Sequence, residues 1–214
     1  DDLVADQAED VGDHPVQGEG GVVPLKESFI KKLNDYCKKN DIILIVDEVQ
    51  TGNGRCGQMY AYMNFGIEPD IVTTAKGIGG GLPLGAAILG EKVQNVLGFG
   101  DHGSTYGGNP IACAGGISVV ERIDEELLCE VREKSQFIFD AFKDAEGVES
   151  VSGLGLMIGI KTKKPAIDIV KKCIEKGVLC LTAKDKVRLL PALNIPMDVL
   201  TKAIEIIKKV CKEV

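Results

Sequence analysis

Apolar positions divide the first half of the chain into segments with helical or strand-like spacing. Between Lys26 and Asn40 the apolar residues recur along one helix face, and Asn40-Asp41 follows as a stop signal. The next residues, Ile42 to Val46, form a continuous apolar run of the kind that is buried on both faces of a parallel sheet. A helix followed at once by a buried strand predicts an α/β fold.

The same alternation continues further along the chain. Ile71 to Thr74 and Leu84 to Leu89 predict a second and a third buried strand, separated by turns rich in glycine and proline. From Asn109 to about Lys143 the pattern predicts helix with a break near Asp124. These segments extend the α/β pattern and end it with a long, interrupted helix.

The last third of the chain has a different pattern, which predicts a small α+β unit. Its expected elements are a strand at Leu154 to Lys161, a helix at Ala166 to Lys176, strands at Val178 to Leu181 and Lys186 to Leu190, and a helix at Met197 to Val214. We therefore expect a domain boundary near residues 107–126. The expected divisions are an atypical acidic segment at 1–14, part of a large domain at 15–107, a bridging helix at 108–125 and a small domain at 126–214.

Charge and cysteine content narrow the class of function. The 214 residues carry a formal net charge of −7 and no cluster of Lys or Arg, which argues against nucleic acid as a partner. The seven cysteines are odd in number and never spaced C-x-x-C, and only two histidines accompany them. This favours reduced, mostly buried thiols in a reducing cytoplasm over a zinc site. No apolar run approaches the ~20 residues of a membrane span, and no signal peptide is visible.

Glycine is unusually frequent, with 26 residues, many of them between Gly77 and Gly116. Glycine suits positions where the backbone approaches another group closely or takes a positive φ. The cluster therefore indicates a ligand site built from loops.

Two charged residues stand at the ends of predicted strands. Asp47 ends the apolar run, and the C-terminal ends of strands are where ligands bind in open α/β sheets. It could equally begin a loop and cap local amides. Lys76 follows the second strand and precedes Gly77-Ile78-Gly79-Gly80-Gly81. An isolated lysine is usually solvated, but a desolvated one has a lowered pKa and can form an imine with an aldehyde.

Three ordered motifs resemble the signature of the class III, fold type I, pyridoxal-phosphate-dependent aminotransferases, and the resemblance covers nearly all of residues 15–214. The motifs are Asp47-Glu48-Val49-Gln50-Thr51-Gly52 with Gly54-Arg55, then Lys76-Gly77-Ile78-Gly79-Gly80-Gly81-Leu82-Pro83, and His102-Gly103-Ser104-Thr105-Tyr106-Gly107-Gly108-Asn109-Pro110. The resemblance implies a large domain with a mostly parallel sheet and a small α+β domain.

Roles for five residues are implied by this resemblance. Lys76 would hold pyridoxal 5'-phosphate as a Schiff base and shuttle the catalytic proton, and Asp47 would pair with the pyridine nitrogen. Gln50 would contact the ring hydroxyl, although it could instead stabilise a turn. Thr105, with Ser104 beside it, would reach the cofactor phosphate of the neighbouring subunit in a homodimer, although Ser-Thr before Gly-Gly also describes an ordinary turn.

A second implied site recognises the substrate. Arg188 lies in the apolar segment Val187-Arg188-Leu189-Leu190-Pro191, where a buried guanidinium requires a counter-ion. The family places an arginine for the substrate carboxylate at this position. Glu19, between Gly18 and Gly20, matches the glutamate that pairs with that arginine, but its flanking glycines also describe a plain loop.

Within the family, the resemblance implies transfer of the δ-amino group of N-acetylornithine to 2-oxoglutarate, in arginine biosynthesis. Ornithine or 4-aminobutyrate as the amino donor is the alternative within the enzyme class. Related chains are about twice as long, and their N-terminal half supplies a phosphate-binding loop and an aromatic residue that stacks on the cofactor. A reading of another class is a non-catalytic fragment or dimerisation module, and an intact mass near 22.8 kDa from the native source would favour it.

Overall fold

The computed structural model describes residues 15–213, so the predicted acidic segment at 1–14 lies outside the described residues. The chain divides into two compact units, which are considered separately. Unit 1 comprises the described end of Asp1–Pro15 together with Leu25–Asn53 and Gln58–Asp124, and unit 2 comprises Val16–Pro24, Gly54–Gly57 and Glu125–Val214.

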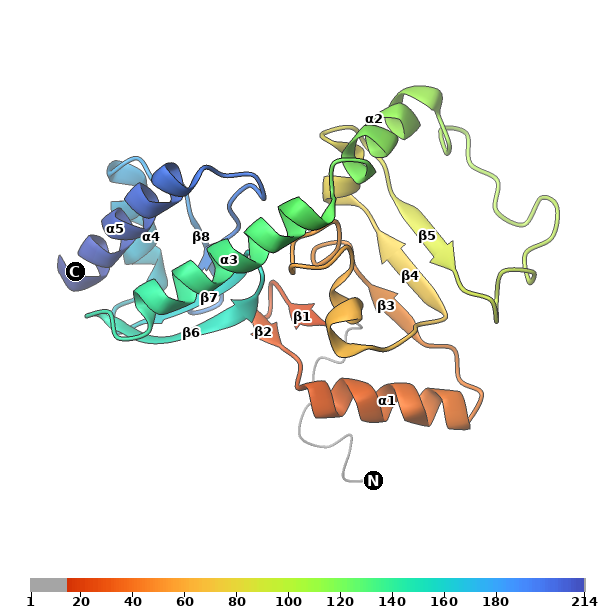
Figure 1. Cartoon of the computed structure of the whole chain (residues 1–214), viewed down its shortest axis with the longest axis horizontal. Coiled ribbons are helices and arrows are strands. Elements are labelled where there is room, and N and C mark those ends of the chain that lie inside the picture. The colour runs from red at the N-terminus through yellow and green to blue at the C-terminus, as the bar shows by residue number, and fades with distance from the viewer. Residues whose placement is uncertain (1–14, 214) are drawn as a thin grey trace. The chain divides into compact units, whose positions relative to one another are not determined.

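Unit 1 is a small mixed sheet with helices before and after it in sequence (Figure 1). Strand β3 pairs in parallel with β4, and β4 pairs antiparallel with β5, giving the order β3-β4-β5. Its elements are α1 (Glu27–Lys39), β3 (Ile45–Asp47), η1 (Ala61–Phe65), β4 (Ile71–Thr74), η2 (Lys76–Gly79), β5 (Ala86–Leu89) and α2 (Pro110–Val120). The predicted first helix and second strand are confirmed, and with them the α/β class.

The first and third strands are shorter and more exposed than predicted. The run from Ile42 to Val46 contributes only its last residues to β3, because Asp41 has a φ of +56° and Ile42 N donates to Cys37 O at 2.9 Å in the cap that ends α1. Ile42 and Ile45 are exposed, and β5 is largely exposed as well. The prediction of strands buried on both faces was wrong for these segments. The antiparallel β5 also makes the sheet mixed where a mostly parallel one was expected.

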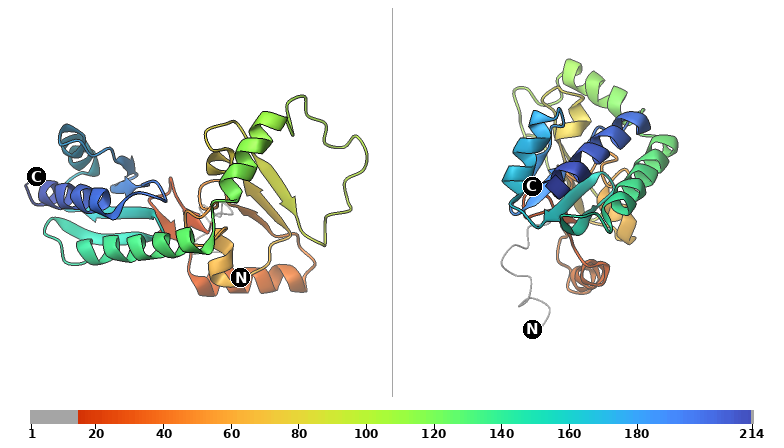
Figure 2. Two further views of the ribbon diagram at one scale, coloured as in Figure 1. Left: turned by 45° about the horizontal axis from the view of Figure 1, so that its top comes forward. Right: turned by 90° about the vertical axis from the view of Figure 1, so that its left-hand side faces the viewer.

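Unit 2 is an antiparallel sheet packed against three helices (Figure 2). Four strands follow the order β6-β7-β9-β8, and a separate pair, β1-β2, comes from the N-terminal residues of the unit. The elements are β1 (Val16–Gln17), β2 (Val23–Pro24), α3 (Glu125–Phe142), β6 (Val148–Leu154), β7 (Met157–Thr162), α4 (Ala166–Glu175), β8 (Leu181–Ala183), β9 (Lys186–Leu189) and α5 (Met197–Glu213).

The core of unit 2 lies between its helices and the four-stranded sheet. Side chains from α3, α4, α5, β7 and β9 form one buried cluster, which includes Ile138, Phe142, Ile158, Ile160, Ile169, Val187 and Ile207. The predicted helices at 166–176 and 197–214 are confirmed. The seven cysteines are free thiols and five of them are buried, as expected.

Two strand predictions in unit 2 were wrong in detail. Leu154 to Lys161 is the turn and second strand of a hairpin, because the chain reverses at Gly155, whose φ is +57°. Val178 to Leu181 contributes only Leu181 to β8, since Gly177 has a φ of +85° and Val178 N donates to Cys173 O at 2.9 Å in the cap that ends α4. The short strands β1 and β2 were not predicted.

The predicted break in the long helix is confirmed. Helix α2 begins after Asn109, whose Oδ1 accepts a hydrogen bond from Ala112 N, with Pro110 in the first helical position. It ends at Val120, and α3 starts at Glu125. Among residues 15–213, no helix combines the length and apolar character needed to span a membrane.

Candidate functional site

Asp47 and Lys76 lie at the same edge of the unit 1 sheet. Asp47 is the last residue of β3 and pairs in register with Thr73 of β4, while Lys76 begins η2 just after β4 ends. Because β3 and β4 are parallel, their C-terminal ends meet at one edge, where ligands bind in α/β sheets. The structure therefore places the predicted carboxylate and the predicted amine at the same edge of the sheet.

The loop after β3 is fixed by a buried carboxylate that the sequence did not single out. Glu48 is fully buried; its Oε2 accepts a hydrogen bond from Thr51 Oγ1 at 2.5 Å and its Oε1 one from Tyr62 N at 2.8 Å. Burial raises the pKa of this carboxyl, and the hydrogen bonds and the nearby Asp47 charge act less strongly. Asp47 Oδ1 accepts a hydrogen bond from Val49 N at 2.8 Å. The buried Glu48 carboxylate therefore holds the loop from inside, while the neighbouring Asp47 carboxylate bonds the first turn of the loop.

Lys76 is exposed at the start of a tight turn. Its φ is +48°, in the left-handed region that non-glycine residues rarely occupy. The turn lies against α2, where an added Cβ on Gly116 would come within 2.6 Å of Leu84, and one on Gly115 within 2.8 Å of Leu82. Part of the glycine cluster therefore permits close packing of the backbone, while Gly81 has open space around it.

The other cofactor candidates lie in two loops of unit 1. Gln50 is half-buried in the loop after β3, at the same edge as Asp47. Ser104 and Thr105 are exposed in the long segment between β5 and α2, which extends away from the sheet in Figure 1. Ser104 Oγ accepts a hydrogen bond from Gly107 N at 2.9 Å, a contact within its own loop.

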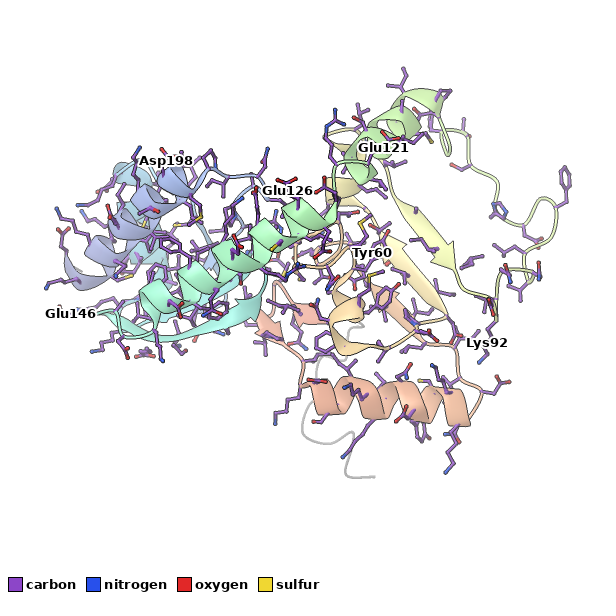
Figure 3. All side chains as sticks on the ribbon, in the orientation of Figure 1. Tyr60, Lys92, Glu121, Glu126, Glu146 and Asp198 are labelled. Atoms are coloured by element: carbon purple, nitrogen blue, oxygen red, sulfur yellow. The ribbon has the colours of Figure 1, made fainter. Side chains whose placement is uncertain are left out.

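Three more polar residues support this edge and were not predicted. Asn53 and Thr74 are buried and hydrogen-bonded to each other, and Tyr60, labelled in Figure 3, forms a hydrogen bond with Thr74. Burial is the main cause of the raised pKa of Tyr60. No periodicity marks such residues, because each is a single polar position in a loop or strand.

In unit 2 the structure joins the two residues predicted to recognise substrate. Arg188, on β9, donates from Nη1 to Glu19 Oε1 at 2.5 Å. The arginine side chain is 9% exposed and that of the glutamate is 70% exposed, so the guanidinium is held in place while the carboxylate remains solvated. Arg188 Nε has no hydrogen-bond partner among the described residues. A buried fork with an unused donor is suited to binding a second carboxylate.

Arg55 has a structural role in unit 2. Its Nη1 donates to Pro191 O at 2.5 Å and to Leu156 O at 3.2 Å. These bonds tie the segment after β9 to the β6-β7 hairpin, and burial lowers the pKa of the guanidinium. Close to Arg188, Lys186 donates to Ser152 Oγ at 2.7 Å, and burial also lowers the pKa of this lysine.

Comparison with known proteins agrees with this geometry. The model of the family "Aminotransferase class-III" matches residues 13–211. The acetylornithine aminotransferase of Haemophilus ducreyi is 46% identical over 200 residues, which cover 92% of this chain and 51% of that protein. The chain spans about half the length of the curated relatives it matches.

Solved structures give the same picture. The N-acetylornithine aminotransferase of Stenotrophomonas maltophilia superposes with a TM-score of 0.83 at 32% identity, over 92% of this chain and 54% of that one. The ornithine δ-aminotransferase of Plasmodium falciparum gives a TM-score of 0.84 at 35% identity, over 94% and 55%.

Proposed function

The chain belongs to the class III aminotransferases, and from that premise we propose that it is part of an enzyme that transfers the δ-amino group of N-acetylornithine to 2-oxoglutarate with pyridoxal 5'-phosphate. We further propose that the enzyme acts in the cytoplasm as a homodimer with shared active sites. Unit 1 would hold the cofactor, and unit 2 would recognise a substrate carboxylate.

The residues at the edge of the unit 1 sheet fit this cofactor. A carboxylate at the end of β3 and an amine just after β4 suit the ring nitrogen and the aldehyde of the cofactor, and Asn53 Oδ1 is buried without a partner among the described residues. When bound, pyridoxal phosphate supplies an electron-withdrawing ring that stabilises negative charge on the substrate carbon.

Each candidate residue then has one task. Lys76 Nζ would hold the cofactor through its aldehyde and, once freed by the incoming amine, would move a proton from the amine-bearing substrate carbon to the former aldehyde carbon. The Asp47 carboxylate would accept a hydrogen bond from the ring N–H and would keep that nitrogen protonated. Gln50 would orient the ring hydroxyl, and Thr105, with Ser104, would bind the phosphate of the partner's cofactor.

Arg188 and Glu19 would allow the enzyme to accept two kinds of substrate. N-acetylornithine reacts at its δ-amine with its α-carboxylate far away, whereas glutamate reacts next to its α-carboxylate. We propose that Glu19 covers Arg188 in the first half-reaction and moves off when glutamate or 2-oxoglutarate binds. The high exposure of Glu19 and the burial of Arg188 support this division of roles. Losing Arg188 would cost the glutamate half-reaction roughly 2 to 5 kcal/mol.

The choice of amino donor rests on the relatives. The curated relatives at 39–46% identity carry the name acetylornithine aminotransferase, while the similar solved structures include ornithine aminotransferases. Ornithine is therefore the second candidate donor. Initial rates of the native enzyme with N-acetylornithine, ornithine and 4-aminobutyrate distinguish the three, and we expect the first to be fastest.

The observation that carries the proposal is the convergence of Asp47 and Lys76 at one sheet edge. Treatment of the native enzyme with pyridoxal phosphate and borohydride should fix the cofactor on Lys76, as read by peptide mass mapping. Lys76→Arg should abolish the adduct, and Lys92→Arg, at an exposed lysine of the same unit, should retain it. An adduct on another lysine, or none, would contradict the assignment, and an intact native mass near 22.8 kDa would favour the non-catalytic fragment.

A further inference from the structure

Asn53 occupies an unusual position in unit 1. It follows the loop after β3, its φ is +55°, and its side chain is buried. Asparagine tolerates the left-handed region better than other non-glycine residues, but its buried amide needs hydrogen-bond partners. The groups that this amide contacts therefore show which part of the chain Asn53 holds in place.

Both donated hydrogen bonds of Asn53 reach the segment just before Lys76. Nδ2 donates to Thr74 Oγ1 at 3.0 Å and to Ala75 O at 3.2 Å. A backbone carbonyl can only accept, so the contact with Ala75 O identifies the nitrogen of the amide. Ala75 O also accepts from Ile78 N at 3.2 Å, which closes the turn that carries Lys76.

Lys76 itself is held in a backbone conformation that lysine seldom adopts. Its φ of +48° lies in the left-handed region, and such residues persist only where surrounding contacts over-determine them. Asn53 supplies a contact of this kind, because it holds the carbonyl of the peptide bond that joins Ala75 to Lys76.

We propose that Asn53 is a positioning residue that fixes the Ala75–Lys76 peptide and thereby directs the Lys76 side chain to the cofactor. This rests on the proposed function for the role of Lys76, but the restraint on the turn does not. Asn53 Oδ1 has no partner among the described residues, whereas Nδ2 makes both of its contacts with the residues just before Lys76. The direct links to Thr74 and Ala75 assign its role to the lysine turn.

The test compares Asn53→Ala with Asn64→Ala. Asn64 is a matched control, since its Nδ2 donates to Ala61 O at 3.1 Å in η1, in the same unit, and it is exposed. Hydrogen exchange of the protein without cofactor should be at least about tenfold faster at the amides of Ile78 and Gly80 in the Asn53 variant, with β4 amides changed less than about twofold. The rate of borohydride-trapped attachment to Lys76 at saturating pyridoxal phosphate should fall about tenfold in the same variant. The Asn64 variant should change neither quantity.

Thr74 provides a second pair of variants if Asn53→Ala fails to fold. Thr74→Ser retains the hydroxyl that Asn53 contacts and should keep both rates near wild type, whereas Thr74→Val should speed exchange at Ile78 and slow attachment. Unchanged exchange at Ile78, or equal acceleration throughout unit 1, would overturn the positioning role. If exchange responds locally but wild-type Lys76 takes up no cofactor, the proposed function fails while the restraint on the turn remains.

Discussion

The two units of the chain bury different kinds of side chain. In unit 2, helices and sheet enclose an apolar cluster in which Ile138, Phe142 and Ile158 are fully buried. In unit 1, Val46 and Val72 are buried, but Ile45 and Ile88 are 42% and 43% exposed among the described residues. Beside its buried apolar residues, the interior of unit 1 contains four polar ones, namely Glu48, Thr51, Asn53 and Thr74.

Apolar and polar groups in a protein interior restrain the chain in different ways. Apolar contacts are non-directional, so they stabilise a core without fixing one atom in one place. Buried hydrogen bonds are directional, and the bonds of Glu48 and Asn53 fix the loops that carry Asp47 and Lys76. Substitutions in the two units should therefore differ in whether they reduce activity or stability.

The largest effect is expected for Asp47→Ala in unit 1. Turnover of the enzyme should fall by about 1,000-fold or more, equivalent to about 4 kcal/mol, since the cofactor nitrogen loses its charged partner. Covalent attachment to Lys76 should persist, because the carboxylate does not form that bond. Steady-state rates and borohydride trapping measure the two properties.

Asp70→Ala is the matched control for that experiment. Asp70 Oδ2 accepts a hydrogen bond from Leu44 N at 2.8 Å, away from the site, so the variant should lose about 1 kcal/mol of stability and little turnover. Near-normal turnover in Asp47→Ala would contradict the role proposed for Asp47.

A large effect on stability is expected in unit 2. Ile158→Ala removes a fully buried side chain from β7 and should lower the free energy of unfolding by about 2 to 5 kcal/mol. Ile88→Ala, on the exposed β5 of unit 1, should cost less than about 1 kcal/mol. Urea unfolding of both variants measures the difference. Equal losses would mean that Ile88 is covered in the native protein and that the contrast between the units is wrong.

The same contrast explains which elements could be predicted from the sequence. Helices α1, α4 and α5 were predicted within a residue or two because each places an apolar face on a core. The prediction for the run Ile42 to Val46 was wrong because periodicity cannot show that Ile42 belongs to the cap that ends α1, or that β3 lies at an edge of the three-stranded sheet. The missed hairpin turn at Gly155 depends on one backbone dihedral.

Site residues that belong to a sequence motif could be predicted, whereas hydrogen bonds between residues far apart in the sequence could not. Asp47 and Lys76 were identified by their positions after strands and by resemblance, and the parallel pairing of β3 with β4 brings them together. The contacts of Glu48 and Asn53 join residues 14 and 21–22 positions apart, and no local pattern encodes such pairs. Glu19 and Arg188 are 169 positions apart and were paired only through the family resemblance.

A smaller effect is expected for Glu19→Ala, which removes the carboxylate that covers Arg188. Efficiency with glutamate relative to N-acetylornithine should rise about tenfold, or about 1.4 kcal/mol, since the guanidinium is then always open. Stopped-flow measurement of the separate half-reactions gives the ratio. Glu149→Ala, at an exposed glutamate of β6, is the control. Equal slowing of both half-reactions would show that Glu19 is only structural.

The smallest effect is expected for Glu48→Gln, which tests the polar interior of unit 1 by its pH dependence. Burial raises the pKa of Glu48 in the folded protein above its value of about 4.3 in an unfolded chain. The folded state therefore binds this proton more tightly, so its contribution to stability is present below the unfolded pKa and is lost as pH rises through the folded pKa. Glutamine keeps the shape without titrating, so the stability of the variant relative to wild type should increase with pH over that window and then level off.

Urea unfolding from pH 4 upward measures this, with exposed Glu91→Gln as control. A relative stability that is flat or falls with pH would mean that the hydrogen bonds of Glu48 stabilise its ionised carboxylate at least as well as water does.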